Sequence, residues 1–283
     1  NPILLHFVTV VIFCQMLAIG VNHSLRELTS LWRQPELLLR SLLAVIVLVP
    51  TVVGLLLWLF DLPPAVATGL AILAAAPGAP LTTKRSQTAG GDPIYAASLQ
   101  LTLALLAVVI TPITLAIFYA LFELATERVT PIEVVRQVAE VTFLPVIIGL
   151  LLQRFAPKFA EIIGKPVQVL ANVLFLLLFI VIIVLLALAP DLREKLNLGA
   201  LPIVAIIVTV VLSLTIGHLL GGPSRAQRSS LAIASIARNA GLALFIAALS
   251  EYGQYFIPTL LTYLILGALV AVPYSMWSKR RTT

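Results

Sequence analysis

Two apolar segments of this chain are interrupted by short stretches that disfavour a continuous helix, PGAPLTTK at residues 77–84 and IARNAG at residues 236–241. Each stretch carries a cation, Lys84 in the first and Arg238 in the second, and the first also contains two prolines and a glycine. Placing a charged side chain inside a membrane costs at least ~2.5 kcal/mol of free energy. We therefore expect Arg238 to have a charge or hydrogen-bond partner or a functional role. Interrupted apolar segments at corresponding places in two halves of a chain are typical of the binding site of a membrane transporter.

The composition indicates a membrane protein. Of the 283 residues, 60% are hydrophobic and 11% are charged, whereas ordinary soluble domains carry roughly 25% charged residues. The formal net charge is +6, but the basic residues are spread over short connecting segments. We therefore expect the lipid bilayer as a partner and no nucleic acid. The single cysteine, Cys14, cannot form a disulfide within the chain.

Apolar stretches of membrane-spanning length recur along the whole chain. About 20 apolar residues cross a bilayer, and fewer suffice where a helix is broken. We predict an all-α polytopic membrane protein with nine transmembrane spans, at about residues 2–21, 37–60, 64–90, 93–122, 131–153, 166–189, 199–221, 224–250 and 255–277. The third and eighth spans contain the interruptions, and several spans, including the sixth at Pro166, are expected to start at a proline.

The distribution of charge predicts the orientation. Thirteen of the eighteen Lys and Arg residues fall in segments that follow odd-numbered spans, and four fall in the alternate segments. Cytoplasmic segments of membrane proteins carry the excess of basic residues. We therefore expect an integral membrane protein with its N-terminus outside and its C-terminus in the cytoplasm, by default in a bacterial inner membrane.

The spacing around the two interruptions is similar. Pro112 follows Pro77 by 35 residues, and Pro273 follows Asn239 by 34. In both stretches a half-helix and a short connection lead into a long apolar helix with a late proline. This spacing predicts that the chain contains an internal repeat.

The predicted repeat defines one transporter unit over residues 1–283. Its copies are residues 1–122 (spans 1–4) and 166–277 (spans 6–9), separated by span 5 at 131–153. An odd number of spans between equivalent helices inverts one copy relative to the other. The two broken helices are then expected to cross near the middle of the membrane.

Three stretches carry a resemblance to a known family, MLAIGV at 16–21, APGAP at 76–80 and RNAGLAL at 238–244. In their order and spacing, and in its nine-span layout, the chain resembles the bile acid:sodium symporter family over essentially its whole length. The resemblance implies panel and core subdomains that are interleaved in the sequence, with the crossed broken helices in the core. It also implies alternating access and sodium-driven import of organic anions such as bile acids, sulfated steroids or small carboxylates.

The chain departs from the family pattern where the resemblance places sodium. A glutamate that serves both sodium sites, and the glutamine four residues after it, correspond here to Ala234 and Arg238. The other ligand positions implied by the resemblance fall at Val45, Thr82 and Thr83, and near Ala96 and Gln100. Hard cations bind best to several oxygen ligands, carboxylates above all. Sodium is therefore disfavoured, and we expect no metal and no cofactor.

We predict that two fixed cations, Lys84 and Arg238, stand at the former sodium sites and attract an anionic substrate. Arginine suits a carboxylate or sulfate because its planar fork donates two parallel hydrogen bonds. The predicted substrate-binding residues are Thr82, Thr83, Ser235, Arg238 and Asn239, with Gln100 as a further polar residue of the core and Glu140 as a coupling or partner carboxylate.

Each of these residues also has a structural interpretation. Arg238 could pair with Glu140 or with carbonyl groups freed at the break, and Lys84 could extend to the cytoplasmic interface. The threonine, serine and asparagine residues of the two interruptions could cap the half-helices.

The sequence thus predicts a secondary transporter of small organic anions that works by alternating access and is not sodium-coupled in the usual way. Two alternatives stay open: a non-transporting receptor that binds an organic anion at the same crossover, and a conventional sodium-coupled symporter with rearranged ligands. An enzyme is not expected, because the sequence has no HExxH motif and no serine or cysteine nucleophile with an evident base. No catalytic residue is predicted, and neither the substrate nor the oligomeric state follows from the sequence.

Overall fold

The computed structural model describes residues 2–79, 81–124, 132, 136, 139–188, 198–250 and 252–282, and within these ranges the chain forms helices and no strand. The helices up to residue 121 are α1 (Pro2–Asn22), α2 (Leu25–Leu28), η1 (Ser30–Arg33), α3 (Pro35–Leu42), η2 (Leu43–Leu48), α4 (Val49–Leu59), α5 (Pro64–Ala75), α6 (Thr82–Thr88) and α7 (Pro93–Leu121). The later helices are η3 (Ala139–Phe143), α9 (Leu144–Phe155), α10 (Pro157–Leu188), α12 (Ala200–Leu220), α13 (Arg225–Ile236), α14 (Ala240–Leu249), η4 (Gly253–Tyr255) and α15 (Ile257–Thr282). The predicted all-α class is confirmed for the described residues.

Helix starts follow local sequence signals. Helices α3, α5, α7 and α10 begin at a proline, whose missing N–H costs nothing in the first turn. The Asp92 carboxylate caps α7 by accepting hydrogen bonds from the N–H groups of Ile94 and Tyr95 at 2.9 and 3.0 Å. Ser224 and Gln227 form a capping box at the start of α13.

The sixth predicted span begins earlier than expected. Helix α10 starts at Pro157, and Pro166 lies inside it and not at its first turn. An internal proline removes one hydrogen bond of the helix, a loss that membrane helices tolerate where neighbouring groups satisfy the freed carbonyl. The predicted start of the fifth span at residue 131 and the end of the sixth at 189 lie outside the described residues.

Six helical stretches among the described residues are long and apolar enough to cross a membrane by themselves: Pro35–Leu59, Pro93–Leu121, Pro157–Leu178, Ala200–Leu220, Arg225–Ala247 and Gly253–Arg280. Two shorter apolar helices, His6–Asn22 and Pro64–Ala75, lie where the first and third spans are predicted. The chain is thus a helical membrane protein, and the count of nine spans stays a prediction.

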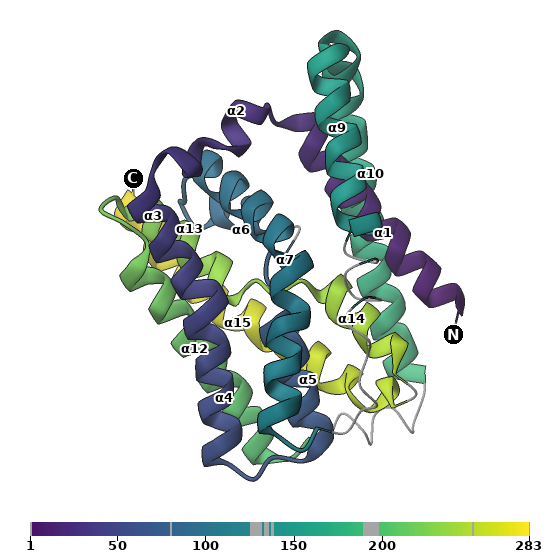
Figure 1. Ribbon diagram of the computed structural model, residues 1–283, viewed down its shortest axis with the longest axis vertical. Helices are drawn as coiled ribbons and strands as arrows, with labels where there is room; N and C mark the ends of the chain where they lie inside the picture. The colour runs from purple at the N-terminus through teal and green to yellow at the C-terminus, as the bar shows by residue number, and fades with distance from the viewer. Residues whose placement is uncertain are drawn as a thin grey trace.

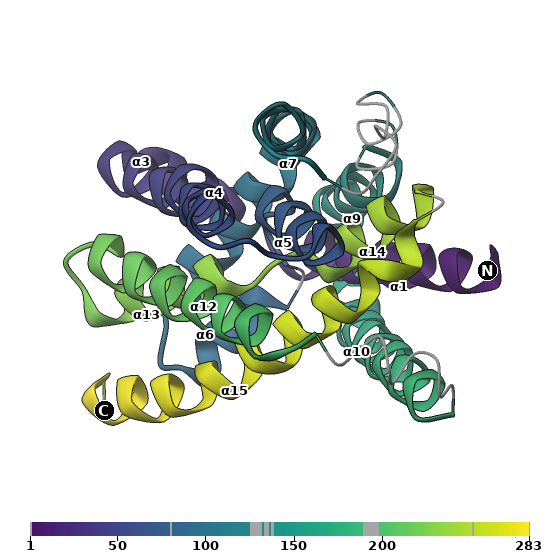
Figure 2. The same cartoon turned by 90° about the horizontal axis from the view of Figure 1, so that it is seen from below.

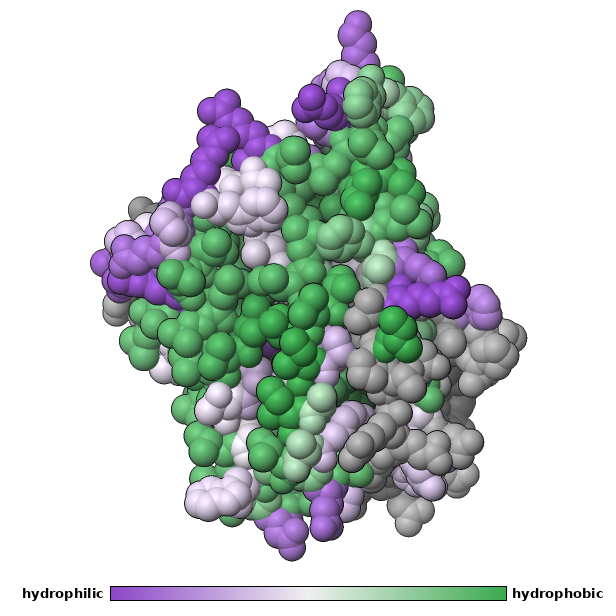
Figure 3. All heavy atoms as spheres, viewed as in Figure 1, coloured by the Kyte–Doolittle hydropathy of each residue, from purple (hydrophilic) through white to green (hydrophobic). Residues whose placement is uncertain are grey.

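The surface fits a membrane environment. Large apolar side chains are widely exposed, among them Trp58 at 76%, Phe155 at 76% and Ile162 at 71%. Figure 3 shows a broad hydrophobic face, with hydrophilic residues gathered mainly toward its edges. Contiguous apolar surface of this extent is stable only against lipid or another apolar partner.

The helices form two groups (Figures 1 and 2). In the small group, α1 packs against both α9 and α10. In the large group, α12 packs against α4, α13 and α15, while α5 and α6 both pack against α7. The two groups meet where α14 of the large group packs against α1 of the small group. The interruptions lie in the large group, close to this seam.

Both predicted interruptions are confirmed. Helix α5 ends at Ala75 and α6 begins at Thr82, and α13 ends at Ile236 and α14 begins at Ala240. Gly78 in the first interruption has a φ of +78°, a conformation that an L side chain rarely adopts. A Cβ at Gly78 would also lie 3.0 Å from the Cβ of Leu103 on α7. The sequence PG at this point therefore both ends α5 and lets the chain turn close to α7.

Candidate functional site

The two interruptions touch each other. The backbone N–H of Asn239 donates a hydrogen bond of 2.9 Å to the carbonyl oxygen of Ala76. The hydroxyl of Tyr263 on α15 donates one of 3.2 Å to the carbonyl oxygen of Ile236. Backbone groups freed where a helix breaks must be satisfied inside the protein. Both bonds do that, and the first brings residues 76 and 239 together.

Arg238 lies at this meeting point and is 2% exposed. Its Nη2 donates to the carbonyl oxygen of Ser235 at 2.9 Å, and its Nη1 lies 3.4 Å from that of Val45 and 3.5 Å from that of Ala74. The guanidinium therefore joins three helical segments, α13, η2 and α5. Its Nε has no hydrogen-bond partner within the described part of the chain.

Arg238 has no carboxylate partner among the described residues. Ion pairs within that part of the chain join Arg40 to Glu36 and Arg136 to Glu140. Glu140 is exposed and pairs with Arg136 at 2.8 Å. The structure therefore does not bring Glu140 to Arg238. Of the two structural interpretations of Arg238, the geometry favours contact with backbone carbonyls.

The second cation near Arg238 is Arg85 and not Lys84. Thr82, Ser86 and Ala89 form the buried face of α6 and its end, and Arg85 lies beside that face, whereas Lys84 is exposed. Arg85 lines the same cavity as Arg238, and Lys84 does not. A helix that buries residue 82 turns residues 85 and 86 to the same side, so the burial of Thr82 accounts for the position of Arg85.

Thr83 and Gln100 are brought together. The hydroxyl of Thr83 donates a hydrogen bond of 2.8 Å to Oε1 of Gln100, and the backbone N–H of Thr83 lies 3.3 Å from the same oxygen. This pair ties α6 to α7. The hydroxyl of Thr82 instead donates to the carbonyl oxygen of Ala79 at 2.7 Å, within the first interruption.

Two polar side chains at the second interruption also make hydrogen bonds to nearby backbone groups. The hydroxyl of Ser235 donates to the carbonyl oxygen of Leu231 at 2.8 Å. Oδ1 of Asn239 accepts a hydrogen bond of 3.1 Å from the N–H of Leu242 and so caps α14. The capping interpretation holds for Asn239, since its side-chain oxygen satisfies an N–H of the first turn.

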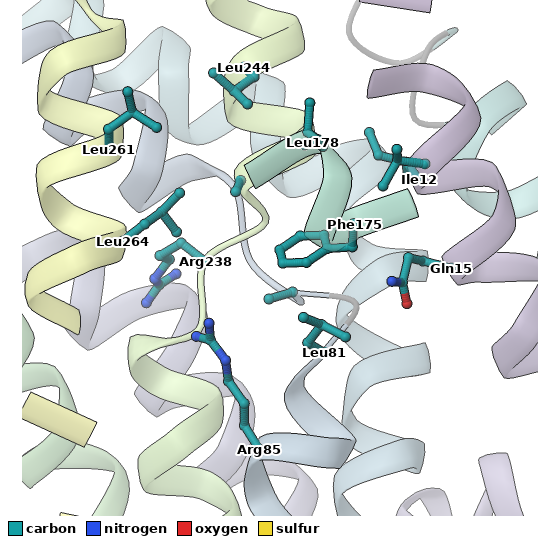
Figure 4. Close-up of a pocket in the computed structure, with 14 residues that line it drawn as sticks. Ile12, Gln15, Leu81, Arg85, Phe175, Leu178, Arg238, Leu244, Leu261 and Leu264 are labelled. Carbon is teal, nitrogen blue, oxygen red and sulfur yellow. The ribbon is translucent and has the colours of Figure 1, made fainter. Parts of the chain in front are cut away.

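A cavity of about 50 Å³ lies at the seam between the two helix groups. Figure 4 shows Arg85 extending from α6 toward the chain that carries Arg238, with apolar side chains around both. The lining residues are Val11, Ile12, Gln15, Ala79, Leu81, Arg85, Phe175, Leu178, Arg238, Ala240, Gly241, Leu244, Leu261 and Leu264. Of the predicted site residues only Arg238 is among them.

The charged side chains that line this cavity are basic. Two arginines line it, and no acidic residue of the described ranges does. Its other walls are apolar apart from Gln15, whose side-chain amide donates to the carbonyl oxygen of Ala171 at 2.9 Å. Apolar walls of this kind lower the local dielectric and strengthen the field of the cations. The arrangement can hold an anionic group next to an apolar one.

Broken helices that meet beside a buried cation, inside a protein with an apolar outer surface, define a class: membrane transporters with discontinuous helices. The chain belongs to one family of this class, because the sequence pattern of the sodium bile acid symporter family matches residues 9–189. The matched segment includes the first interruption and ends before the second.

Part of the chain is similar in sequence to proteins named P3 protein. The P3 protein of Homo sapiens is 28% identical over 176 residues, which is 62% of this chain and 37% of the human protein. The P3 proteins of Mus musculus and Bos taurus are 29% and 28% identical over the same shares. The chain thus spans little more than a third of the length of these relatives.

Proposed function

We propose that this protein is a secondary transporter that carries organic anions by alternating access and does not use sodium in the way that the name of its family describes. The observation that carries the proposal is the cavity at the seam, which two arginines line and which, among the described residues, no acidic side chain lines. A ligand that enters it has to supply the negative charge. Membership of the transporter family supports movement of this ligand across the membrane.

The surroundings of Arg238 do not fit a sodium ion. Sodium is a hard cation and needs several oxygen ligands. The backbone carbonyl oxygens of Val45, Ala74 and Ser235 face the guanidinium of Arg238 at 2.9 to 3.5 Å. No group of three or more His, Cys, Asp or Glu side chains is close enough to hold a metal within the described ranges. We propose that the arginine supplies, as a fixed charge, what a bound cation would supply.

The arrangement of the two helix groups supports alternating access. The cavity is lined by α1 and α10 of the small group and by α6, α14 and α15 of the large group. Movement of one group against the other would open and close it. We propose that the small group is the panel and the large group the core of one unit with nine spans in two inverted copies. The C-terminus is then cytoplasmic, as the excess of basic residues favours.

The size of the cavity limits which part of a substrate it can hold. A volume of about 50 Å³ suits a carboxylate, a sulfate or a few waters, whereas pockets for whole drug-sized ligands measure about 300–1,000 Å³. A small carboxylate would fit with little change. A steroid-sized anion would place its charged group here and would need the helix groups to separate.

Thermal stability of the purified protein tests this proposal. Pyruvate, taurocholate and estrone sulfate would be added in turn to the wild type, to Arg238→Gln and to the control Arg154→Gln, which removes an exposed charge. A ligand that binds only the folded state at 100 times its Kd stabilises it by about 2.7 kcal/mol. We expect stabilisation of the wild type and the control, and at least a tenfold loss of affinity in Arg238→Gln. Equal binding by all three variants would contradict the proposal.

Transport is tested separately from binding. Counterflow of the stabilising anion into proteoliposomes distinguishes a transporter from a receptor that binds the same anion. Accumulation that requires the wild-type protein supports transport. Binding without accumulation would favour the receptor instead.

The conventional sodium symporter is the second candidate, because the family to which the chain belongs is named for sodium. It predicts that an anion stabilises the protein only when sodium is present. The absence of an acidic residue around Arg238, within the described part of the chain, argues against it.

A further inference from the structure

Arg85 borders three cavities. The first is the seam cavity that it shares with Arg238. The second, of about 240 Å³, lies between α6 and α10 and is lined by Leu81, Lys84, Arg85, Thr88, Asn172 and Phe175. The third, of about 420 Å³, is lined by residues of α6, α13 and α15. Among the basic residues of the described chain, Arg85 alone lines both the first cavity and the second.

The guanidinium of Arg85 has no partner among the residues that the structure describes. It is half-buried, and within the described part of the chain it makes no ion pair and no side-chain hydrogen bond. Partial burial of an arginine side chain costs free energy when no group of the protein pairs with its charge. Figure 4 shows its side chain extended from α6 toward the second interruption, and not folded back on its own helix.

The α6–α10 cavity, which we call the outer cavity, continues the seam cavity. The two share Leu81, Arg85 and Phe175, and both have walls from the two helix groups. The outer cavity adds the exposed ammonium of Lys84 and the side chain of Asn172. The third cavity differs, because its walls on α15 include Val272 and Met276, which expose large apolar surfaces as lipid-facing residues do.

We propose that the outer cavity is a second anion site, that it takes the carboxylate or sulfate group of an organic anion between Lys84 and Arg85, and that Arg85 passes this group to the inner site beside Arg238. This rests on the proposed function of the inner site and adds a residue that acts at both positions. An anion held by Lys84 and Arg85 needs to exchange only one of its two cations to reach Arg238. It therefore stays paired throughout, and the cost of an unpaired charge in an apolar passage is avoided.

The two sites are expected to have different tasks. Lys84 is exposed, so it attracts anions from water and its effect is screened by salt. Arg238 is buried, so it sets the affinity of the inner site. Arg85 lines both sites, so it contributes to capture of the anion at the outer site and to its retention at the inner site.

Anion enrichment in the outer cavity can be measured without knowing the substrate. Phe175 lines both cavities, and a Phe175→Trp variant places a fluorophore there when Trp32, Trp58 and Trp277 are replaced by phenylalanine. Quenching by iodide, divided by quenching by neutral acrylamide, reports the local concentration of anions and corrects for access. The control Lys158→Gln removes an equal charge from an exposed position on α10 that lines none of the described cavities.

We expect the quenching ratio to fall about two-fold in Lys84→Gln and further in Arg85→Gln, since a fixed cation raises the local concentration of anions. It should stay unchanged in Lys158→Gln and be largely retained in Arg85→Lys. A ratio that is equal in all of these variants would overturn the proposal. Uptake of the anion that stabilises the wild type should slow in Lys84→Gln at unchanged affinity. If no organic anion stabilises the wild type, the proposed function fails, whereas the iodide measurement still tests the charge of the outer cavity.

Discussion

Asn239 donates its backbone N–H to the carbonyl oxygen of Ala76 at 2.9 Å. The two residues are far apart in the sequence, and each lies where an apolar helix has ended. This single bond therefore links the two interruptions. It also places Arg238, the neighbour of Asn239, against the carbonyl groups at the end of α5.

The side chain of Asn239 gives the first prediction. Asn239→Ala removes the oxygen that accepts from the N–H of Leu242, but it leaves the backbone bond to Ala76 in place. Loss of such a cap costs about 1 kcal/mol of unfolding free energy. Asn239→Ser keeps an acceptor and should lose less than half as much. Denaturation in detergent micelles measures both, and equal losses would contradict the capping role.

Thr83 and Gln100 give the second prediction. Thr83→Val removes the hydroxyl that donates to Oε1 of Gln100 at 2.8 Å, and we expect a loss of about 0.5–1.5 kcal/mol in unfolding free energy. Gln100→Leu and the double variant complete a mutant cycle. The two effects should be coupled by at least about 0.5 kcal/mol, because the residues touch. Strict additivity would mean that the contact contributes nothing.

Close packing of α1 and α9 gives the third prediction. A Cβ added at Gly149 would lie 2.6 Å from the backbone nitrogen of Val21 and 2.7 Å from the carbonyl oxygen of Leu17. Backbone atoms cannot move aside as a flexible side chain can, so Gly149→Ala should cost about 1–3 kcal/mol and loosen the small helix group.

Gly267 on α15 is the matched control for this substitution. A Cβ there meets no atom within 4 Å, and replacing glycine by alanine in a helix gains about 0.5–1 kcal/mol. Melting temperatures of the two variants should therefore move in opposite directions. A fall of similar size in both would indicate a general intolerance of added volume and not a tight helix crossing.

The interruptions could be predicted from the sequence because their signals are local. Proline followed directly by glycine at residues 77 and 78 disfavours continuation of a helix, and Arg238 stands out because its neighbours are apolar. A cation in such a stretch is costly to bury, so its burial against freed carbonyls was among the interpretations. The pairing of Glu140 with Arg136 is local too, since the residues lie four apart in the sequence.

Neighbouring residues in the sequence do not determine which residue is the second cation of the cavity. Lys84 and Arg85 are adjacent, and which of them faces the cavity depends on the rotation of a helix of seven residues. That rotation is set by contacts of Thr82 and Ser86, such as the hydrogen bond between the hydroxyls of Ser86 and Ser230. Such contacts join distant parts of the chain, so they do not follow from the order of the residues.

The central claim is that Arg238 acts as a fixed charge where a sodium-coupled relative would need a bound ion. The most direct test is the affinity of the wild type for the stabilising anion, measured by thermal shift in sodium chloride and again in potassium chloride of equal ionic strength. We predict the same Kd in both salts, and the same accumulation in proteoliposomes with and without a sodium gradient. Anion binding that appears only with sodium would contradict the claim and would make this protein a conventional symporter with rearranged ligands.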